Sequence, residues 1–186
     1  MRLFKTVHDF DYSWHTVSAA QWQKYPNPDC PHVQHVDVLD SSVDPETGVL
    51  RIERLISVDQ KAPTLILRAM GASSTQYVRE VALIDPKTKT MTLSSKNLTL
   101  SNILSCEESI TYTQHPTIPE KTLFSQQATI SAGSAVSRMA SMIEDWSVKR
   151  FQQNALLGRD AFSKVLERFV VLAEAKEEAA ATSGSK

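Results

Sequence analysis

The feature that most constrains the fold of this chain is a series of seven segments whose residues alternate between two faces. Such alternation is typical of strands that bury one side and expose the other. Most of the segments are joined by short connections, which favour antiparallel neighbours because parallel strands need a long crossover. The sequence therefore predicts an antiparallel meander. The segments cover residues 3–10, 32–39, 49–58, 76–84, 91–100, 103–114 and 123–132.

Helical periodicity appears near both ends of this series. Ser13 can cap a short helix in which Trp14, Val17 and Ala20 recur at three-residue spacing. From about residue 134 the period becomes helical again, which predicts a long helix lying across the sheet. The expected fold class is α+β, with a curved seven-stranded antiparallel sheet closed by a long C-terminal helix around a cavity. Residues 1–172 should form this domain, whereas the charged, Ala-rich tail at 173–186 should fray.

Composition limits the classes of function. The chain has 186 residues, of which 41% are hydrophobic and 22% charged, enough for one domain with a large core or an internal cavity. Its net charge of −1 gives no overall attraction to nucleic acid, so no such partner is expected. No apolar run reaches the roughly 20 residues of a membrane-spanning helix. Cys30 and Cys106 stand alone, so we expect neither a metal site nor a cofactor.

A rigid corner and a flap are the next features. Pro26 and Pro28 forbid helix and turn the chain from its opening helix into the sheet, with Lys24 before the corner and His32 after it. Residues 61–71 interrupt the strand pattern with an apolar segment flanked by proline and glycine. We expect a mobile lid there, although a helical crossover packed on the core explains the same pattern. The expected lid residues are Pro63, Leu65, Ile66, Leu67 and Met70.

Arg54 interrupts an otherwise apolar, inward face of the segment 49–58. A buried guanidinium requires an anion, because burial without a partner is prohibitively costly. A ligand could supply this anion. Glu108, on the inward face of the segment 103–114, could supply it as well. Both interpretations of Arg54 stay open at this level.

Other cations could join Arg54 in the enclosed space. Apolar walls with converging cations suit an amphiphile with an anionic head, held by charge-assisted hydrogen bonds. Each candidate also has a plainer explanation: Lys24 as a helix-end charge, Lys61 as a solvated loop charge, and the two long-helix residues as exposed or capping groups. The candidates are Lys24, Arg54, Lys61, Arg150 and Asn154.

Catalytic motifs do not stand out. The sequence lacks a nucleophile elbow, a P-loop, a Gly-rich dinucleotide turn and a paired-histidine metal motif. A cavity enzyme of the polyketide-cyclase type, with Glu108 as base, is one alternative, but no second acid or base is placed for it. A non-transferring scaffold with a solid interior is another. We therefore expect a binding protein and not an enzyme.

Several uncommon words of the sequence occur together in one known family. The words KYPNP at residues 24–28, REV at 79–81 and EDWS at 144–147, followed by Arg150-Phe151 and Asn154, resemble the PRELI/slowmo family of intramitochondrial phospholipid transfer proteins. The resemblance runs in order from the first residue to about residue 169. Its opening residues and the words VDVL, VREV and EDWSV are more similar to the slowmo-type, phosphatidylserine-carrying branch than to the branch that carries phosphatidic acid.

The resemblance implies a START-like fold around one lipid, a lid at residues 61–71, and action in the mitochondrial intermembrane space, entered without a cleaved leader. It also implies transient peripheral contact with membranes and a small helical partner with twin Cys-x-nine-Cys motifs. The implied cargo is phosphatidylserine, with phosphatidic acid as a second candidate; Leu157 stands where some relatives have a lysine. The implied head-group contacts are Lys24, His32, Arg54, Lys61, Arg150 and Asn154.

Overall fold

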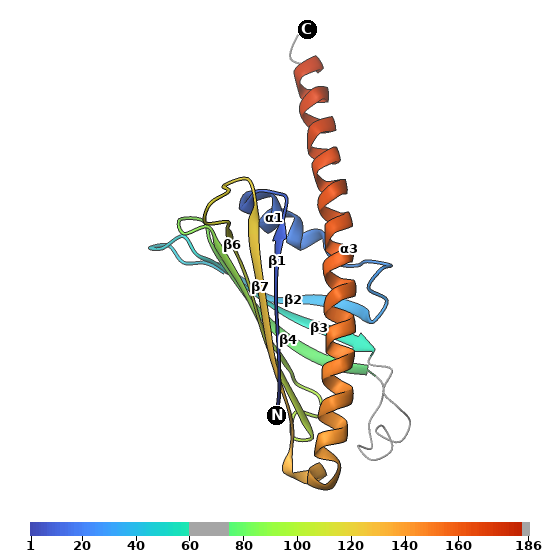
Figure 1. The fold of residues 1–186 in the computed structure, drawn as a ribbon. Helices are drawn as coiled ribbons and strands as arrows, with labels where there is room; N and C mark the ends of the chain where they lie inside the picture. The colour runs from blue at the N-terminus through green and yellow to red at the C-terminus, as the bar shows by residue number, and fades with distance from the viewer. Residues whose placement is uncertain (60–74, 184–186) are drawn as a thin grey trace.

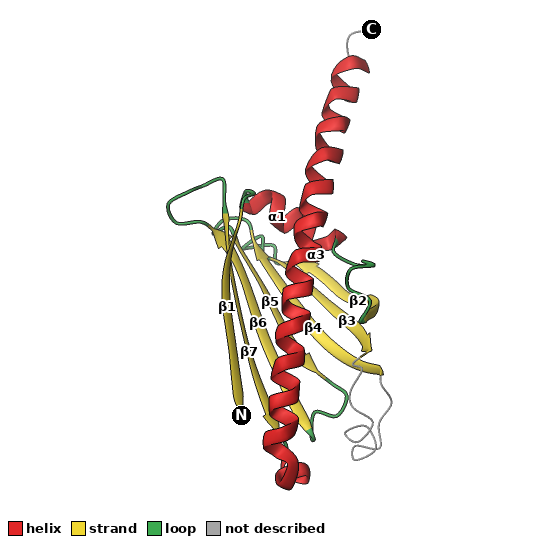
Figure 2. Cartoon of the chain, turned by 45° about the vertical axis from the view of Figure 1, so that its right-hand side comes forward, coloured by secondary structure: helices red, strands yellow, loops and turns green. Residues whose placement is uncertain are grey.

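A computed structural model describes residues 1–59 and 75–183 of the chain. Seven strands in these ranges form one sheet, and a very long helix crosses its concave face (Figures 1 and 2). The strands are β1 (Arg2–Phe10), β2 (Val33–Val43), β3 (Leu50–Asp59), β4 (Thr75–Asp85), β5 (Thr90–Asn97), β6 (Leu104–Gln114) and β7 (Thr122–Ala132). The helices are α1 (Trp14–Ala20), η1 (Gln21–Gln23), η2 (Ser134–Met139) and α3 (Ala140–Ser183).

The sheet has the order β1-β7-β6-β5-β4-β3-β2, and every neighbouring pair is antiparallel. The predicted meander is confirmed from β2 to β7. The first strand does not extend the meander at its start but pairs with β7 at the opposite end. Because β1 leads into α1, this pairing places the short opening helix beside the last strands of the sheet (Figure 1).

Local side-chain bonds explain where several strands end. Asp44 accepts hydrogen bonds from the backbone N–H groups of Glu46 and Thr47 at 2.9 and 2.8 Å, and Gly48 completes the turn at φ 77°. Asn97 ends β5 three residues earlier than the alternation predicts. Its side-chain amide donates to the Leu104 carbonyl at 2.8 Å and accepts from the Cys106 N–H at 2.7 Å, so it closes the loop into β6.

The helix α1 begins as the sequence predicts. The Ser13 hydroxyl accepts a hydrogen bond from the Thr16 N–H at 3.3 Å, which satisfies one free donor of the first turn. Trp14, which is buried, donates its indole N–H to the Tyr112 carbonyl at 3.1 Å and so anchors the helix on β6. Val17 is fully buried against the same core. The helix continues as η1, whose C-cap is Lys24.

The long helix α3 packs mainly on β7, β1 and α1. Phe162 is the largest of its buried side chains, and its ring meets that of Phe10 edge to face at 5.6 Å between centroids. At the start of α3, Glu144 accepts a hydrogen bond from the Ala132 N–H at 2.9 Å, and Asp145 binds the Arg2 guanidinium at 2.7 Å. These bonds fix the corner between β7 and the helix.

The prediction that residues 173–186 fray is wrong for the part up to Ser183, which continues α3 as a helix. Ala, Glu and Lys dominate this stretch and are strong helix formers. Extending a helix that packing has already nucleated is also far easier than starting one. The segment 171–176 is exposed, and the end of α3 projects beyond the sheet (Figure 1). None of the helices in residues 1–59 and 75–183 combines the length and apolarity needed to cross a membrane.

Candidate functional site

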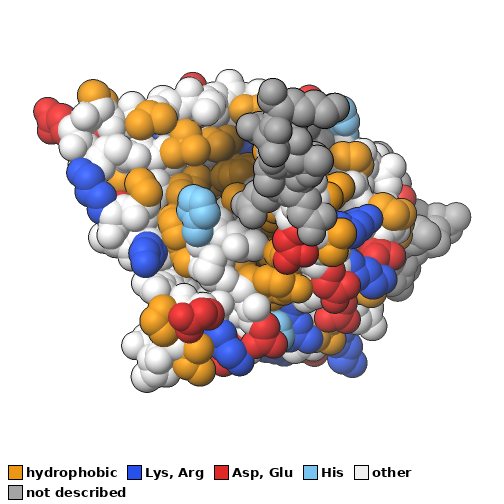
Figure 3. Space-filling view, turned by 90° about the horizontal axis from the view of Figure 1, so that it is seen from above, with side chains coloured by type: hydrophobic (Ala, Val, Ile, Leu, Met, Phe, Trp, Pro, Cys, Tyr) orange, Lys and Arg blue, Asp and Glu red, His pale blue; other side chains and the backbone are white. Residues whose placement is uncertain are grey.

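A cavity lies between α3 and the concave face of the sheet. Because α3 packs on β7 and β1, it leaves space above the strands β3 to β6. The space measures about 240 Å³, and most of its lining is apolar. Figure 3 shows hydrophobic side chains gathered around a hollow in the molecular surface. The apolar walls include Ile56, Val58, Val78, Leu93, Ile110, Phe124, Phe151 and Phe162.

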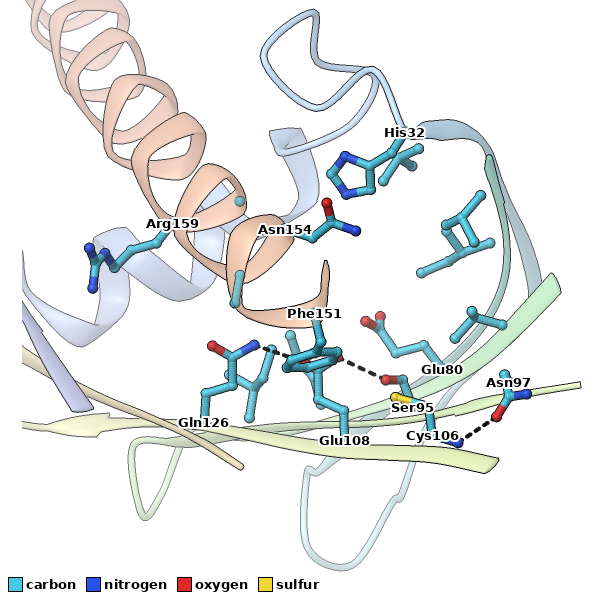
Figure 4. Close-up of a pocket in the computed structure, with 18 of the residues that line it drawn as sticks. His32, Glu80, Ser95, Asn97, Cys106, Glu108, Gln126, Phe151, Asn154 and Arg159 are labelled. Atoms are coloured by element: carbon cyan, nitrogen blue, oxygen red, sulfur yellow. Dashed lines mark hydrogen bonds between the residues drawn. The ribbon is translucent and has the colours of Figure 1, made fainter. Parts of the chain in front are cut away.

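Four basic residues line this cavity: Lys24 from the end of η1, His32 from the turn before β2, and Arg150 and Arg159 from α3. The side chain of Arg159 points away from Asn154 and His32 (Figure 4). Burial lowers the pKa of His32 from its ordinary 6.5, and the positive charges of Arg150 and Lys24 lower it further. These three groups therefore share one electrostatic environment. The structure brings Lys24, His32 and Arg150 of the predicted set to one cavity, and their contact with a head group stays a prediction.

The Lys24 ammonium lies over aromatic rings, 5.4 Å from the ring centre of Tyr25 and 5.8 Å from that of Phe162. Such cation–π contacts stabilise a cation only partly when it leaves water. Among the described residues, no carboxylate lies within 4 Å of the ammonium groups of Lys24 or the guanidinium of Arg150. Both cations are thus available to an anion in the cavity.

One edge of α3 carries polar atoms without partners. Ser147, Arg150 and Asn154 are spaced three and four residues apart, so they follow one face of the helix into the cavity. Their Oγ, Nε and Oδ1 atoms are buried and have no hydrogen-bond partner among the described residues. Figure 4 shows Asn154 and His32 pointing toward the same space. Buried polar groups are normally satisfied, so this edge indicates a polar ligand.

Ser147 was not among the site residues predicted from the sequence, although its spacing from Arg150 could have identified it. Ser147 is only 7% exposed and lines the cavity from the same helix face. Ser147 belongs to the EDWS motif, in which Glu144 and Asp145 have a structural role because their carboxylates bind the Ala132 N–H and Arg2. A structural role of the whole motif was therefore the simpler interpretation.

The proposed ion pair between Arg54 and Glu108 is wrong. Arg54 instead binds Glu80, which lies directly opposite on β4: Nε donates to Oε1 at 2.9 Å, and Nη2 makes a second bond to the same oxygen. Glu108 lies on β6, two strands beyond β4 and too far across the sheet. The guanidinium also stacks on Trp22, 5.1 Å from its ring centre. Both partners of the pair are buried, and Arg54 is not among the described residues that line the cavity.

Glu108 forms part of a polar floor of the cavity, together with Gln126 and Ser95. Its Oε1 accepts from the Gln126 amide at 2.5 Å, and its Oε2 accepts from the Ser95 hydroxyl at 3.0 Å (Figure 4). Burial raises the pKa of Glu108, while these two hydrogen bonds and the charge of Lys24 partly offset that effect. The cavity therefore has a basic side and an acidic floor.

Comparison with known proteins identifies the family. The model of the PRELI-like family matches residues 15–171 of this chain. The chain belongs to the PRELI-like family. It is 42% identical over 170 residues to the mitochondrial protein UPS2 of Saccharomyces cerevisiae, covering 91% of this chain and 74% of that protein. It is 35% identical over 187 residues to the slowmo homolog of Dictyostelium discoideum, covering 100% of this chain and 79% of that protein.

Solved structures share the overall fold of this PRELI-like chain. The Zhui aromatase/cyclase from Streptomyces sp. R1128 is similar with a TM-score of 0.62 at 12% identity, and the match covers 91% of this chain and 95% of that one. At such low identity the likeness shows the fold alone.

Lys61 and the expected lid residues of this PRELI-like chain, Pro63, Leu65, Ile66, Leu67 and Met70, lie outside the described residues. Their roles stay predictions. The described residues contain no group of three His, Cys, Asp or Glu side chains arranged to hold a metal ion.

The titration of His32 provides a direct test of the basic side. Without ligand, its pKa should lie below 6.5, because burial, Arg150 and Lys24 all disfavour the imidazolium. An anionic head group beside it should raise this pKa. Binding then takes up a proton, and affinity increases as pH falls toward the free-state pKa. NMR titration of the His32 ring, assigned by its loss in His32→Asn, measures both midpoints; a midpoint that does not move on loading would contradict the arrangement.

Proposed function

We propose that this chain is a phospholipid transfer protein that carries phosphatidylserine between the outer and inner mitochondrial membranes. The observation that carries the proposal is the unpartnered polar edge of α3, Ser147, Arg150 and Asn154, which faces Lys24 and His32 across an apolar cavity. An amphiphile matches both parts. Its phosphate accepts hydrogen bonds from the Ser147 hydroxyl and the Arg150 Nε–H, while the unpartnered Asn154 Oδ1 can accept one from a donor of the head group. Its acyl chains contact the apolar walls.

Loading requires a change of shape. The space between the described side chains, about 240 Å³, is smaller than the roughly 300–1,000 Å³ of pockets that enclose drug-sized ligands. A lipid with two acyl chains therefore moves α3 away from β3 to β6 or extends its chains beyond the cavity. The helix is suited to such movement, because its packing is concentrated on β7, β1 and α1.

The mechanism is non-covalent. The protein contacts one membrane, a lid formed by residues 61–71 opens, and a single lipid enters head first. Lys24, His32, Lys61, Arg150 and Asn154 hold the head group until the protein reaches the other membrane. Release reverses the sequence of steps, and no bond is made or broken.

We infer the location and the partner from membership of the family. The relative from Saccharomyces cerevisiae is named mitochondrial, which supports action in the mitochondrial intermembrane space. A small helical protein with twin Cys-x-nine-Cys motifs forms a heterodimer with the chain and covers exposed apolar surface. Leu3 and Val7 on β1 and Val171 and Leu172 on α3 are exposed apolar residues of the kind that a partner would cover.

The choice of phosphatidylserine rests on the similarity to the slowmo-type branch, which the Dictyostelium discoideum relative represents by name. Leu157 supports it, because the lysine that some relatives have there would favour a more anionic head group.

A transfer assay tests the proposal. The purified chain, with its helical partner, is mixed with donor vesicles containing labelled phosphatidylserine and with unlabelled acceptor vesicles. We expect transfer that is saturable and far above the spontaneous rate, with phosphatidylserine intact on recovery. Chemical change of a bound small molecule without transfer would instead favour a cyclase-type enzyme. Absence of both transfer and copurified lipid, measured by native mass spectrometry, would favour a scaffold.

A further inference from the structure

Glu108 is a carboxylate on the cavity floor whose hydrogen-bond partners are both neutral. Ser95 donates to one of its oxygens and Gln126 to the other. Among the described residues, no Lys, Arg or His side chain lies within 4 Å of Glu108. The other cavity carboxylate, Glu80, differs in that Arg54 already neutralises it. Of the two glutamates that line the cavity among the described residues, Glu108 is therefore the one without a cationic partner.

The geometry around Glu108 prepares it to accept a further contact. Two donors on neighbouring strands, β5 and β7, hold the carboxylate from both sides and orient it on the floor (Figure 4). Orienting a buried carboxylate without a counter-charge costs stability that an apolar residue of similar size would not. A cation from the ligand would remove this cost.

The helix α3, on the opposite side of the cavity from Glu108, gives independent evidence that a polar ligand group occupies this space. The Ser147 hydroxyl is unpartnered, and the residue is 93% buried against the same cavity. Lys24 also contributes to the cavity, and its charge acts on Glu108 through the shared space. A ligand group in this space thus meets cationic and unpartnered polar atoms on one side and a carboxylate on the other.

We propose that Glu108 binds the ammonium group of an aminophospholipid head while Lys24 and Arg150 bind its phosphate. The inference rests on the proposed function and adds the residue that selects the cargo. A head group with an ammonium pairs with Glu108. Phosphatidic acid has no cation to offer and brings a second negative charge toward the carboxylate, so it is disfavoured. The same chemistry admits phosphatidylethanolamine as well as phosphatidylserine.

The variant Glu108→Gln tests this assignment, because it keeps the size of the side chain and removes its charge. The matched control is Glu107→Gln, one residue away on the other face of β6, where the carboxylate is exposed and paired with Lys96 at 2.6 Å. Both are compared with the wild type in vesicle transfer of phosphatidylserine, phosphatidylethanolamine and phosphatidic acid with identical acyl chains.

We expect Glu108→Gln to lower the ratio of phosphatidylserine to phosphatidic acid transfer by about tenfold, the size expected for one charge-assisted contact. The ratio of phosphatidylethanolamine to phosphatidic acid transfer should fall by the same factor. Glu107→Gln should leave both of these ratios unchanged. Transfer of phosphatidic acid by Glu108→Gln serves as the measure that the variant is folded. If it transfers nothing, Ser95→Ala, which only loosens Glu108, should show a smaller loss in the same direction.

The two proposals fail in different ways. A wild-type protein that transfers no phospholipid overturns the proposed function together with this inference. A wild-type protein that transfers phosphatidylserine, with a ratio unchanged in Glu108→Gln, overturns the ammonium site alone. If Glu108→Gln is inactive, an unchanged ratio of phosphatidylserine to phosphatidic acid transfer in Ser95→Ala also overturns the ammonium site.

Discussion

Arg54→Ala should destabilise the domain by about 3–5 kcal/mol, the usual cost of removing one member of a buried ion pair. Arg54 is 5% exposed, and its removal leaves the carboxylate of Glu80, a residue that is 9% exposed, without the two hydrogen bonds that neutralise it. The stacking contact with Trp22 is lost as well. Urea and thermal unfolding measure the effect, and the melting temperature should fall by on the order of 10 °C.

Arg79→Ala is the matched control on the adjacent strand. Arg79 also binds a carboxylate across the sheet, that of Glu53 at 2.6 Å, but its side chain is 48% exposed. Its removal should cost no more than about 1 kcal/mol, because water replaces the lost partner. Replacing both members of the buried pair, as in Arg54→Met with Glu80→Leu, should recover much of the lost stability.

The opposite outcome would return Arg54 to the binding site. If Arg54→Ala keeps its unfolding midpoint and loses lipid transfer, the head-group role implied by the family resemblance is correct. The ion pair with Glu80 would then contribute little to folding.

Arg150→Glu should lower the rate of transfer at limiting lipid by about tenfold to a hundredfold while the fold is retained. The side chain lies at the cavity and has a buried Nε without a partner, so its reversal removes a charge-assisted contact and places a carboxylate beside the phosphate. Its lack of an ion pair among the described residues explains why stability should change little. Vesicle transfer and circular dichroism measure the two effects separately.

Lys149→Glu is the control for Arg150→Glu, because it makes the same charge reversal at the neighbouring, exposed position of α3. Its transfer rate should stay within about twofold of the wild type, since surface charges contribute little. Equal losses in the two variants would mean that the net charge of the helix matters for membrane contact and that Arg150 has no special place in the cavity.

The sequence was informative where a single element decides the outcome. Alternation of residues 3–10 predicted β1, and Ser13 predicted the start of α1. Lys24, His32, Arg150 and Asn154 were identified as candidates and do reach one cavity. For these residues the hydrophobic periodicity and the family motifs predict the same inward direction. The direction of a side chain follows from the period of its own strand or helix.

The sequence was less informative where two elements must meet. Glu80 was visible in the REV word, yet only the register of β3 and β4 places it against Arg54. The same holds for Glu108, which needed Ser95 on β5 and Gln126 on β7 to become an oriented acceptor. Cross-strand contacts depend on strand order and register, and neither is encoded in the pattern of a single strand.

The sequence by itself determined the elements of this protein: seven strands, a capped short helix, a long closing helix, and the cations and apolar residues that face inward. Hydrophobic periodicity and capping are local, so a single chain segment carries them. Only the tertiary structure decided which charges are neutralised inside the protein and which are left for a ligand. That distinction divides Arg54, paired with Glu80, from Arg150 and Glu108, because pairing depends on distances between strands that are far apart in the chain.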